Sequence, residues 1–249
     1  MSASPPLALE IAAGSLGSAL AAQAAGADRV ELCEGLSSGG TTPSYGTLAL
    51  ARERVRIPLF VLVRPRAGDF LYDAREADVM LRDIEMCVCL GCDGVVIGAL
   101  QADGAIDLPL CERLVAAAGS LQVTFHRAFD AARDLAQALE QVIALGCQRV
   151  LTSGGQATAM EAAERIAALV RQAAGRVTVM PGAGIDAGNV TALAMQTGAR
   201  EFHASAKATR VSSMAFHNPA LQGLVPDWSE TDPARVRALR AALDAVSRR

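Results

Sequence analysis

Hydrophobic and polar positions along this chain repeat a pattern of helix, glycine and short apolar run. Four segments carry the pattern, at residues 25–33, 90–98, 145–154 and 197–205. In each, a helix-like stretch ends at a glycine, and a strand-like run follows after a short turn. Neighbouring glycines of the four are 52 to 65 residues apart, which is room for two strand–helix units. The pattern therefore predicts one further strand in every gap.

Apolar runs stand where these further strands are expected. They cover residues 56–65, 121–129 and 176–184, and another run at 7–13 precedes them all. Each is short and rich in Val, Ile, Leu or Phe, as strands buried on both faces are. The sequence therefore predicts eight strands.

Helical stretches alternate with these strands. Residues 75–90 and 158–174 carry apolar residues three and four positions apart, and a last helix is expected over 232–246 with Pro233 in its first turn. No linker divides the chain. We therefore predict one α/β domain over residues 1–249, a single (β/α)8 TIM barrel. An open doubly wound sheet is the alternative, although such sheets usually stop at about five or six strands.

Composition narrows the classes of function. A hydrophobic content of 51% with only 4% aromatic residues suits helices packed on parallel strands. The net charge of −3 is spread over interspersed charges, so no nucleic-acid surface is expected. The sequence has no uninterrupted run of 18 apolar residues, so no membrane span is expected. The first 15 residues lack the basic start of a signal peptide. We expect a cytoplasmic protein that binds neither nucleic acid nor membrane.

Six cysteines in a chain expected in the cytoplasm indicate reduced thiols rather than a disulfide framework. Three of them cluster at Cys87, Cys89 and Cys92. On one continuous helix Cys87 and Cys89 face nearly opposite ways, and only Cys89 and Cys92 share a face. Because buried cysteine behaves as a small hydrophobic residue, packing is favoured over a metal site here.

The run Val-Thr-Phe-His-Arg-Ala-Phe-Asp over residues 123–130 begins apolar and ends polar. In TIM barrels the C-terminal strand ends carry binding and catalysis, and alternate residues of a strand face the axis. Thr124 and His126 share one face, so we expect both to point to the axis and Arg127 to pair outside the barrel wall. The same alternation brings other ionisable side chains to the mouth, and the predicted catalytic set is Glu10, Glu31, Arg64, Arg66, His126 and His203.

Two interpretations of this set stay open. Charged side chains are rarely buried unless paired, so the set can be a structural layer of salt bridges. In a ligand site, a glutamate would act as general base, a histidine as acid, and the arginines would stabilise developing negative charge. Proton abstraction, isomerisation and aldol-type chemistry all fit the second interpretation.

A small phosphorylated or carboxylated ligand suits this mouth, because arginine binds both groups in a bidentate way. The glycine loop over residues 180–186 follows a predicted strand, at the place where many TIM barrels bind phosphate. A plain tight turn is the other interpretation of this loop. The predicted anion-binding residues, here and at neighbouring strand ends, are Thr152, Ser153, Gly154, Gly182, Gly184 and Ser205.

Six motifs together make the sequence similar to a known family. They are ADRVELCEGLSSGGTTPSYG, VLVRPRAGDFLY, VTFHRAFD, RVLTSGG, MPGAGI and EFHASAKATR, in this order between residues 9 and 210. With them the chain resembles the CutC family of copper homeostasis proteins. The resemblance implies a TIM barrel, a cytoplasmic location, a homo-oligomer such as a dimer or tetramer, and a role in copper handling.

The resemblance also implies one cysteine on each of the first two strands, and thiolate is the soft ligand that Cu(I) prefers. The second of these is Cys33, whereas Ala12 stands at the place of the first. Cys33 is therefore the predicted Cu(I) ligand, and it would need Met180, a histidine or a second subunit as partner. Core packing is the alternative for this residue.

Residues 207–231 are predicted as a long loop, because few apolar residues recur there at regular spacing. Long loops in compact domains are usually functional or disordered. Phe216 and Trp228 would anchor this loop over the barrel mouth or on a second subunit. Three functions are considered: copper homeostasis with Cu(I) at Cys33, an enzyme acting on a small anion, and a non-catalytic assembly protein with a structural mouth. Copper homeostasis is the predicted function, on the resemblance, and the enzyme is the alternative mechanism.

Overall fold

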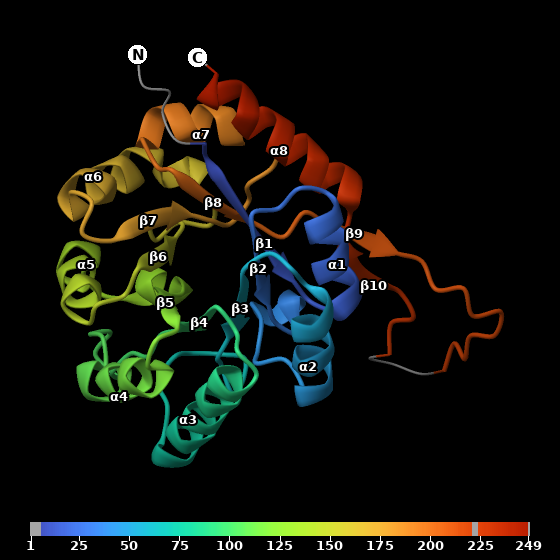
Figure 1. The fold of residues 1–249 in the computed structure, drawn as a ribbon, viewed down its shortest axis with the longest axis horizontal. Helices are drawn as coiled ribbons and strands as arrows, with labels where there is room; N and C mark the ends of the chain where they lie inside the picture. The colour runs from blue at the N-terminus through green and yellow to red at the C-terminus, as the bar shows by residue number, and fades with distance from the viewer. Residues whose placement is uncertain (1–5, 221–223, 249) are drawn as a thin grey trace.

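Eight parallel strands form a barrel in the computed structural model, which describes residues 6–220 and 224–248 (Figure 1). The strands are β1 (Ala8–Ala13), β2 (Arg29–Leu32), β3 (Leu59–Leu62), β4 (Gly94–Ile97), β5 (Gln122–Phe125), β6 (Arg149–Thr152), β7 (Thr178–Pro181) and β8 (Glu201–Ala204). Their hydrogen-bonded order is β7-β6-β5-β4-β3-β2-β1-β8, so consecutive strands from β1 to β7 are paired and β8 is paired with β1. The predicted TIM barrel is confirmed.

Helices form an outer ring around the strands (Figure 1). They are α1 (Leu16–Ala24), α2 (Tyr45–Arg54), α3 (Ala74–Cys89), α4 (Leu108–Ala118), α5 (Leu135–Ala144), α6 (Ala163–Ala173), α7 (Val190–Thr197) and α8 (Pro233–Ser247). Short 3-10 turns are η1 (Leu36–Ser38), η2 (Arg127–Ala131) and η3 (Met160–Ala162). Among the described residues, no helix combines the length and the apolar composition that crossing a bilayer would require.

The barrel wall separates two kinds of core. Leu9 and Ile11 of β1 point outward into the large apolar layer between strands and helices, and both are fully buried. Glu10 and Ala12 alternate with them and point inward. A smaller apolar cluster lies inside the barrel, and its buried members are Cys33, Phe60, Leu62 and Val96. The interior therefore combines this cluster with charged side chains, and these position the site.

Helix α3 ends in a glycine-dependent turn that reverses the chain. Gly91 has a φ of +67°. The backbone N–H of Cys92 donates to the Cys87 carbonyl at 3.0 Å, and that of Gly91 donates to the Val88 carbonyl at 3.0 Å, which is the Schellman pattern. Cys89 and Cys92 would share a face only on a continuous helix, and α3 ends at Cys89. The turn carries Cys92 back over Cys87, and Cys89 is exposed.

The segment predicted as a long loop is an arm with a paired base. β9 (Lys207–Arg210) and β10 (Trp228–Thr231) form an antiparallel pair, and the arm projects away from the barrel (Figure 1). Phe216 and Trp228 are exposed, so neither holds the arm over the barrel mouth. Residues 221–223 of the predicted loop lie outside the described residues. Packing of the arm on a second subunit stays a prediction.

Candidate active site

A small cavity lies inside the barrel at the C-terminal ends of the strands. Its volume is about 110 Å³, which corresponds to about four water molecules at ~30 Å³ each. Four of the six predicted catalytic residues meet in its wall. The lining residues are Ala12, Glu31, Leu36, Gly39, Leu62, Arg64, Phe70, His126, Arg127, Leu151 and His203.

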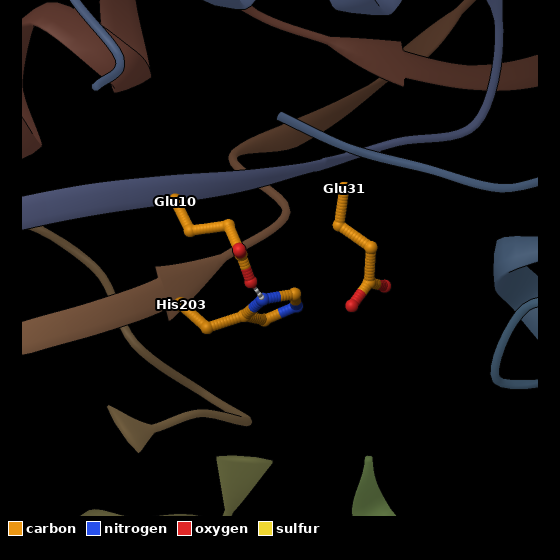
Figure 2. Close-up of side chains that lie close together, drawn as sticks. All are labelled: Glu10, Glu31 and His203. Carbon is orange, nitrogen blue, oxygen red and sulfur yellow. Dashed lines mark hydrogen bonds and ion pairs between the residues drawn. The ribbon is translucent and has the colours of Figure 1, made fainter. Parts of the chain in front are cut away.

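Two carboxyl groups flank the imidazole of His203. His203 Nδ1 lies 2.7 Å from Oε1 of Glu10, and Figure 2 shows the ring between Glu10 and Glu31. One ligand atom from each of the three residues lies within 4.8 Å of the others. They come from β1, β2 and β8, which are adjacent in the sheet. The result is a compact cluster of one imidazole and two carboxyl groups.

Arg29 gives the two glutamates different acidities. Burial by itself would raise the pKa of Glu10, but the ion pair with Arg29 and the contact with His203 outweigh burial and lower it to about 2. Glu31 has no such compensation, and burial raises its pKa to about 7 while His203 opposes the rise. At neutral pH Glu10 is ionised and Glu31 is near its midpoint, as a general acid–base group should be.

His203 is the partner through which Glu31 titrates. Burial lowers the pKa of His203, but the charges of Glu31 and Glu10 and the hydrogen bond to Glu10 outweigh burial and raise it. The imidazole is therefore more basic than that of a free histidine, and its Nδ1 lies against Glu10. Two groups this close titrate as a pair rather than as independent sites.

His126 contributes a neutral donor. Its Nδ1 accepts a hydrogen bond from the backbone N–H of Ala128 at 3.1 Å. Burial, reinforced by the charge of Arg64, lowers the pKa of His126 to about 3, so the ring is neutral and its proton is on Nε2. A Cβ on Gly98 would lie 2.5 Å from the ring, so glycine at this position makes the room. The buried Nε2 has no hydrogen-bond partner.

Arg64 brings positive charge to the cavity and is held by the backbone. Its Nη1 donates to the carbonyls of Ser38 at 3.0 Å and Gly40 at 2.7 Å, and its Nη2 donates to the carbonyl of Gly68 at 2.7 Å. These partners are neutral, so they fix the guanidinium without cancelling its charge. The buried Nε has no hydrogen-bond partner, and its N–H is available to an anionic ligand.

Polar atoms without partners converge on this cavity. Glu31 Oε2, Arg64 Nε and His126 Nε2 are all buried and unpaired, and all three residues line the cavity. Buried polar groups are nearly always paired, and leaving one unpaired costs about 1–3 kcal/mol. A ligand with an acceptor for the two N–H groups and a proton for the carboxyl group would satisfy all three.

A second charged group lies at the N-terminal end of the barrel and is fully paired. Arg29, Arg149 and Glu201 are the first residues of β2, β6 and β8. Glu201 lies 2.7 Å from Arg29 and 2.8 Å from Arg149. The guanidinium carbons lie 5.1 and 5.2 Å from the centre of the Phe60 ring. This N-terminal layer is a structural salt-bridge layer, which lies outside the set of residues predicted at the mouth.

Arg66 lies outside the barrel. Its guanidinium pairs with Asp69 at 2.9 Å and with Glu76 of α3 at 2.5 Å, and 38% of its side chain is exposed. The expectation that Arg66 faces the axis was wrong. Strand β3 ends at Leu62, so the alternation of a strand no longer applies four residues later.

The residues after β6 that were predicted to bind an anion already bind a carboxylate of the same chain. The Asp130 carboxylate accepts from Thr152 Oγ1 at 2.5 Å and from the Ser153 backbone N–H at 2.9 Å. Arg127 pairs with the same carboxylate at 2.8 Å, at the cavity rim rather than outside the wall. The Gly154 N–H donates to Thr152 Oγ1 at 2.8 Å. These donors are therefore occupied within the chain.

The other predicted anion-binding residues lie in separate places. A Cβ on Gly182 would lie 2.5 Å from Leu151, so this glycine lets the β7 loop pass close to the cavity wall. Gly184 has a φ of +68° and no room for a side chain beside Thr158. Ser205 lines a larger cavity of about 630 Å³ between residues 185–188 and α8. The predicted set does not form one site.

Cys33 does not fit a Cu(I) site. It is fully buried, its thiol donates to the Ala13 carbonyl at 3.7 Å, and burial raises its pKa. The side chains packed around it are apolar. Met180 Sδ lies 3.3 Å from Nη2 of Arg29, and a cation beside the sulfur opposes metal binding. A single protonated thiol among apolar groups is a core residue.

Sequence reasoning missed three residues of the site. Arg29 shares a face of β2 with Glu31, so the alternation that selected Glu31 also pointed to it. Phe70 covers the cavity, with its ring 5.0 Å from the Arg64 guanidinium and 5.0 Å from the His126 ring. Asp130, which holds the end of β6, is the last residue of the motif over 123–130. Phe70 comes from an irregular loop, and no periodic pattern indicated it.

Comparison with known proteins places this barrel in a family. A profile of the CutC family matches residues 7–208. A CutC family protein of Xanthomonas campestris pv. campestris (strain B100) is 59% identical over 231 residues, which cover 93% of this chain and 96% of that protein. The chain belongs to the CutC family. A CutC family protein of Chromobacterium violaceum is 54% identical over 95% of this chain and 98% of its own. The family resemblance of the sequence motifs is confirmed.

Solved structures agree with this assignment. A CutC protein from Streptococcus agalactiae, provisionally described as a copper homeostasis protein, superposes with a TM-score of 0.77 at 34% identity, over 80% of this chain and 98% of that one. Phosphoribosylanthranilate isomerase from Thermotoga maritima superposes with a TM-score of 0.58 at 11% identity, over 96% and 98% of the two chains. At that identity the likeness to the isomerase shows the TIM-barrel fold alone.

Proposed function

We propose that this CutC family member is an enzyme that transfers a proton on a small anionic substrate bound at the barrel mouth. The observation that carries the proposal is Glu31. Its carboxyl group is buried beside His203, has a pKa raised to about 7 by burial, and keeps one oxygen unpaired at the cavity. Burying such a group is costly for the fold, and active sites are where that cost has a use.

The unpaired donors define how the substrate lies. The N–H groups at Arg64 Nε and His126 Nε2 both require an acceptor, and a carbonyl or carboxylate oxygen supplies it. The charge of Arg64 favours a substrate that is anionic or becomes anionic in the transition state. The volume of about 110 Å³ limits the part of the substrate inside the barrel to a few heavy atoms.

These positions support proton abstraction next to a carbonyl group. Ionised Glu31 takes the proton from the carbon, and the electron pair of the C–H bond moves to the carbonyl oxygen. The resulting enolate oxygen accepts hydrogen bonds from His126 and Arg64. The proton then returns to carbon from Glu31, or from His203, whose imidazole Glu10 holds in place. No atom is gained or lost, so the step is an exchange or an isomerisation.

Solvent deuterium exchange tests this function. The protein is incubated in D2O with pyruvate, hydroxypyruvate or acetoacetate, and NMR measures loss of the proton next to the carbonyl. The variants are Glu31→Gln and a matched control, Glu161→Gln, which removes an exposed carboxylate on η3. We expect exchange with wild type and control, and a rate lower by about 1,000-fold in Glu31→Gln.

Two results would contradict the enzyme. One is that every probe exchanges deuterium with the wild type no faster than in protein-free solution. The other is that Glu31→Gln exchanges as fast as wild type, which would show that the carboxyl group does not take the proton.

Copper homeostasis is the second candidate function. It is favoured by the 34% identity to the Streptococcus agalactiae protein that carries this provisional description. The surroundings of Cys33 argue against that residue as the point of contact with Cu(I). A copper role of this chain, with Cu(I) as cargo, therefore needs different ligands. Assembly into a homo-oligomer is proposed on the resemblance alone.

A further inference from the structure

A cavity of about 630 Å³ lies between the loop after β7 and the first half of α8. Its lining residues come from 185–188 after β7, from 205–207 after β8 and from α8 itself, so it lies at the same end of the barrel as the mouth. The Cα atoms of His203 and Ser205 are at most about 7 Å apart. Of the six residues predicted to bind an anion, Ser205 alone is among the lining residues. The cavity is therefore a neighbour of the mouth.

Small side chains leave room in this cavity, among them those of Ala187, Ala206 and Ala238. Ala206 has a φ of +47°, in the left-handed region. Its carbonyl accepts from the backbone N–H of Asp232 at 2.9 Å. The chain therefore turns sharply between β8 and β9, and the turn places Lys207 beside the start of α8.

Two cationic side chains line the cavity, Lys207 of β9 and Arg235 in the first turn of α8. Arg235 Nη1 donates to the Lys207 carbonyl, a neutral group that holds the guanidinium without cancelling its charge. In the part of the chain that the structure describes, neither cation has a carboxylate partner. Arg210 of the same strand provides the contrast, because it pairs with Glu230 at 3.2 Å.

One carboxylate, that of Asp186, also lines the cavity. Its Oδ1 accepts from the backbone N–H groups of Gly188 at 2.8 Å and Asn189 at 3.1 Å, so the carboxylate is bound at the start of α7. Two positive charges and one negative charge leave the lining with a net charge of +1. A hollow lined by an excess of one sign of charge attracts ions of the other sign. The expected ligand is therefore an anion.

We propose that this cavity binds a phosphate group between Lys207 and Arg235. The guanidinium presents N–H donors in a planar fork that fits phosphate oxygens, and the ammonium group adds a point charge. A phosphate monoester carries a charge of about −1.5 to −2 at pH 7, so it balances two cations better than a carboxylate does. The Ser205 hydroxyl, which also lines the cavity, supplies a neutral donor.

This phosphate subsite extends the substrate class proposed at the mouth. The mouth cavity has the volume of about four water molecules, which is too small for a carbonyl group and a phosphate group together. A short carbon chain spans the distance of about 7 Å from His203 to the subsite. The substrate is then a small phosphorylated carbonyl compound. That assignment rests on the enzyme proposed at the mouth, whereas phosphate binding itself does not.

Phosphorus-31 NMR tests the subsite with inorganic phosphate as the probe. Protein is titrated into phosphate at neutral pH and low ionic strength, and the width of the phosphate line reports binding. The variants are Lys207→Gln and Arg235→Gln. The matched control is Arg237→Gln, which removes an exposed charge from the same helix outside the cavity. We expect saturable broadening with wild type and control, and an affinity lower by about 10-fold in each cavity variant.

Three outcomes would overturn the subsite. The first is a wild type that gives no saturable broadening. The second is a loss of affinity in Arg237→Gln as large as that in Arg235→Gln. The third concerns Ala238→Glu, which adds a carboxylate to the cavity wall and should abolish binding; unchanged binding contradicts the location. All the substituted side chains are exposed, so the variants should fold, and circular dichroism verifies this.

A second probe, glycerol 3-phosphate, separates a phosphate ester from free phosphate. Binding at least as tight as that of inorganic phosphate supports the link to a substrate, and binding of inorganic phosphate alone overturns that link. Deuterium exchange of pyruvate is measured without phosphate, so the two proposals fail separately. A wild type that binds phosphate and exchanges no probe keeps the subsite and contradicts the enzyme. The reverse result contradicts the subsite and keeps the enzyme.

Discussion

The two ends of the barrel interior contain the same kinds of charged side chain and differ in how these are paired. At the N-terminal end, Arg29, Arg149 and Glu201 satisfy one another around the Phe60 ring. At the mouth, buried polar atoms of the lining residues point at a cavity without partners. Residue type therefore does not separate a structural layer from a candidate active site. What separates them is whether the buried polar atoms have hydrogen-bond or ion-pair partners.

Glu10 belongs to both ends. It is paired with Arg29 of the N-terminal layer and hydrogen-bonded to His203 of the mouth. The paired layer thus keeps Glu10 ionised, and ionised Glu10 raises the proton affinity of His203. The ion pair at the N-terminal end of the barrel therefore influences the protonation of His203 at the mouth.

The largest expected effect comes from breaking the paired layer. Arg29→Ala leaves Glu10 and Glu201 buried with less compensation, and we expect the free energy of unfolding to fall by about 3–5 kcal/mol. Urea denaturation at pH 7 measures the change. Arg82→Ala is the control, because Arg82 forms an exposed pair with Glu85. If Arg29→Ala unfolds at the same urea concentration as the control, the N-terminal layer does not stabilise the fold.

A substitution at the mouth is expected to have an intermediate effect on the free energy of unfolding, and to raise it rather than lower it. The raised pKa of Glu31 means that between about pH 4.5 and pH 7 the folded state holds a proton that the unfolded state has lost. The free energy of unfolding therefore declines as the pH rises through this window, by on the order of 3 kcal/mol. Glu31→Gln removes the titration.

Urea denaturation from pH 4 to pH 8 compares Glu31→Gln with wild type. The free energy of unfolding of the variant should increase relative to that of wild type as the pH rises. The full difference should be reached above pH 7. A constant difference across the range would show that Glu31 titrates normally and is no acid–base group.

The smallest expected effect comes from Arg66, which belongs to neither end of the barrel. Its ion pairs with Asp69 and Glu76 are at the surface, where such pairs contribute about 0–1 kcal/mol. Arg66→Ala should therefore stay within about 1 kcal/mol of wild type and exchange deuterium at the wild-type rate. Arg64→Ala in the same assay should lose exchange. Loss of exchange in Arg66→Ala would place Arg66 at the substrate after all.

Much of the fold could be predicted from sequence, because a helix–glycine–strand pattern recurs along the chain and each repeat specifies its own unit. Strand alternation also selected Glu31, His126 and His203, since each lies within a strand or one residue after it. The same rules failed beyond element ends. Arg66 lies four residues past β3, and Cys92 lies past the turn that ends α3.

Contacts between segments that are distant in the sequence were the second limit on predicting the site. Thr152 and Ser153 have the donors that an anion site requires, and nothing in their own segment shows that Asp130 already accepts from them. Phe70 covers the cavity from an irregular loop. Such contacts follow from tertiary packing, which local periodicity does not encode.

Ala12 is the smallest chiral side chain in the wall of the mouth cavity. It is held on β1 between the paired strands β2 and β8, so the backbone at this point cannot move aside for a ligand. Any larger side chain at position 12 would take its volume directly from the cavity. A larger residue at position 12 would therefore reduce the space at the mouth without altering any of the ionisable side chains around it.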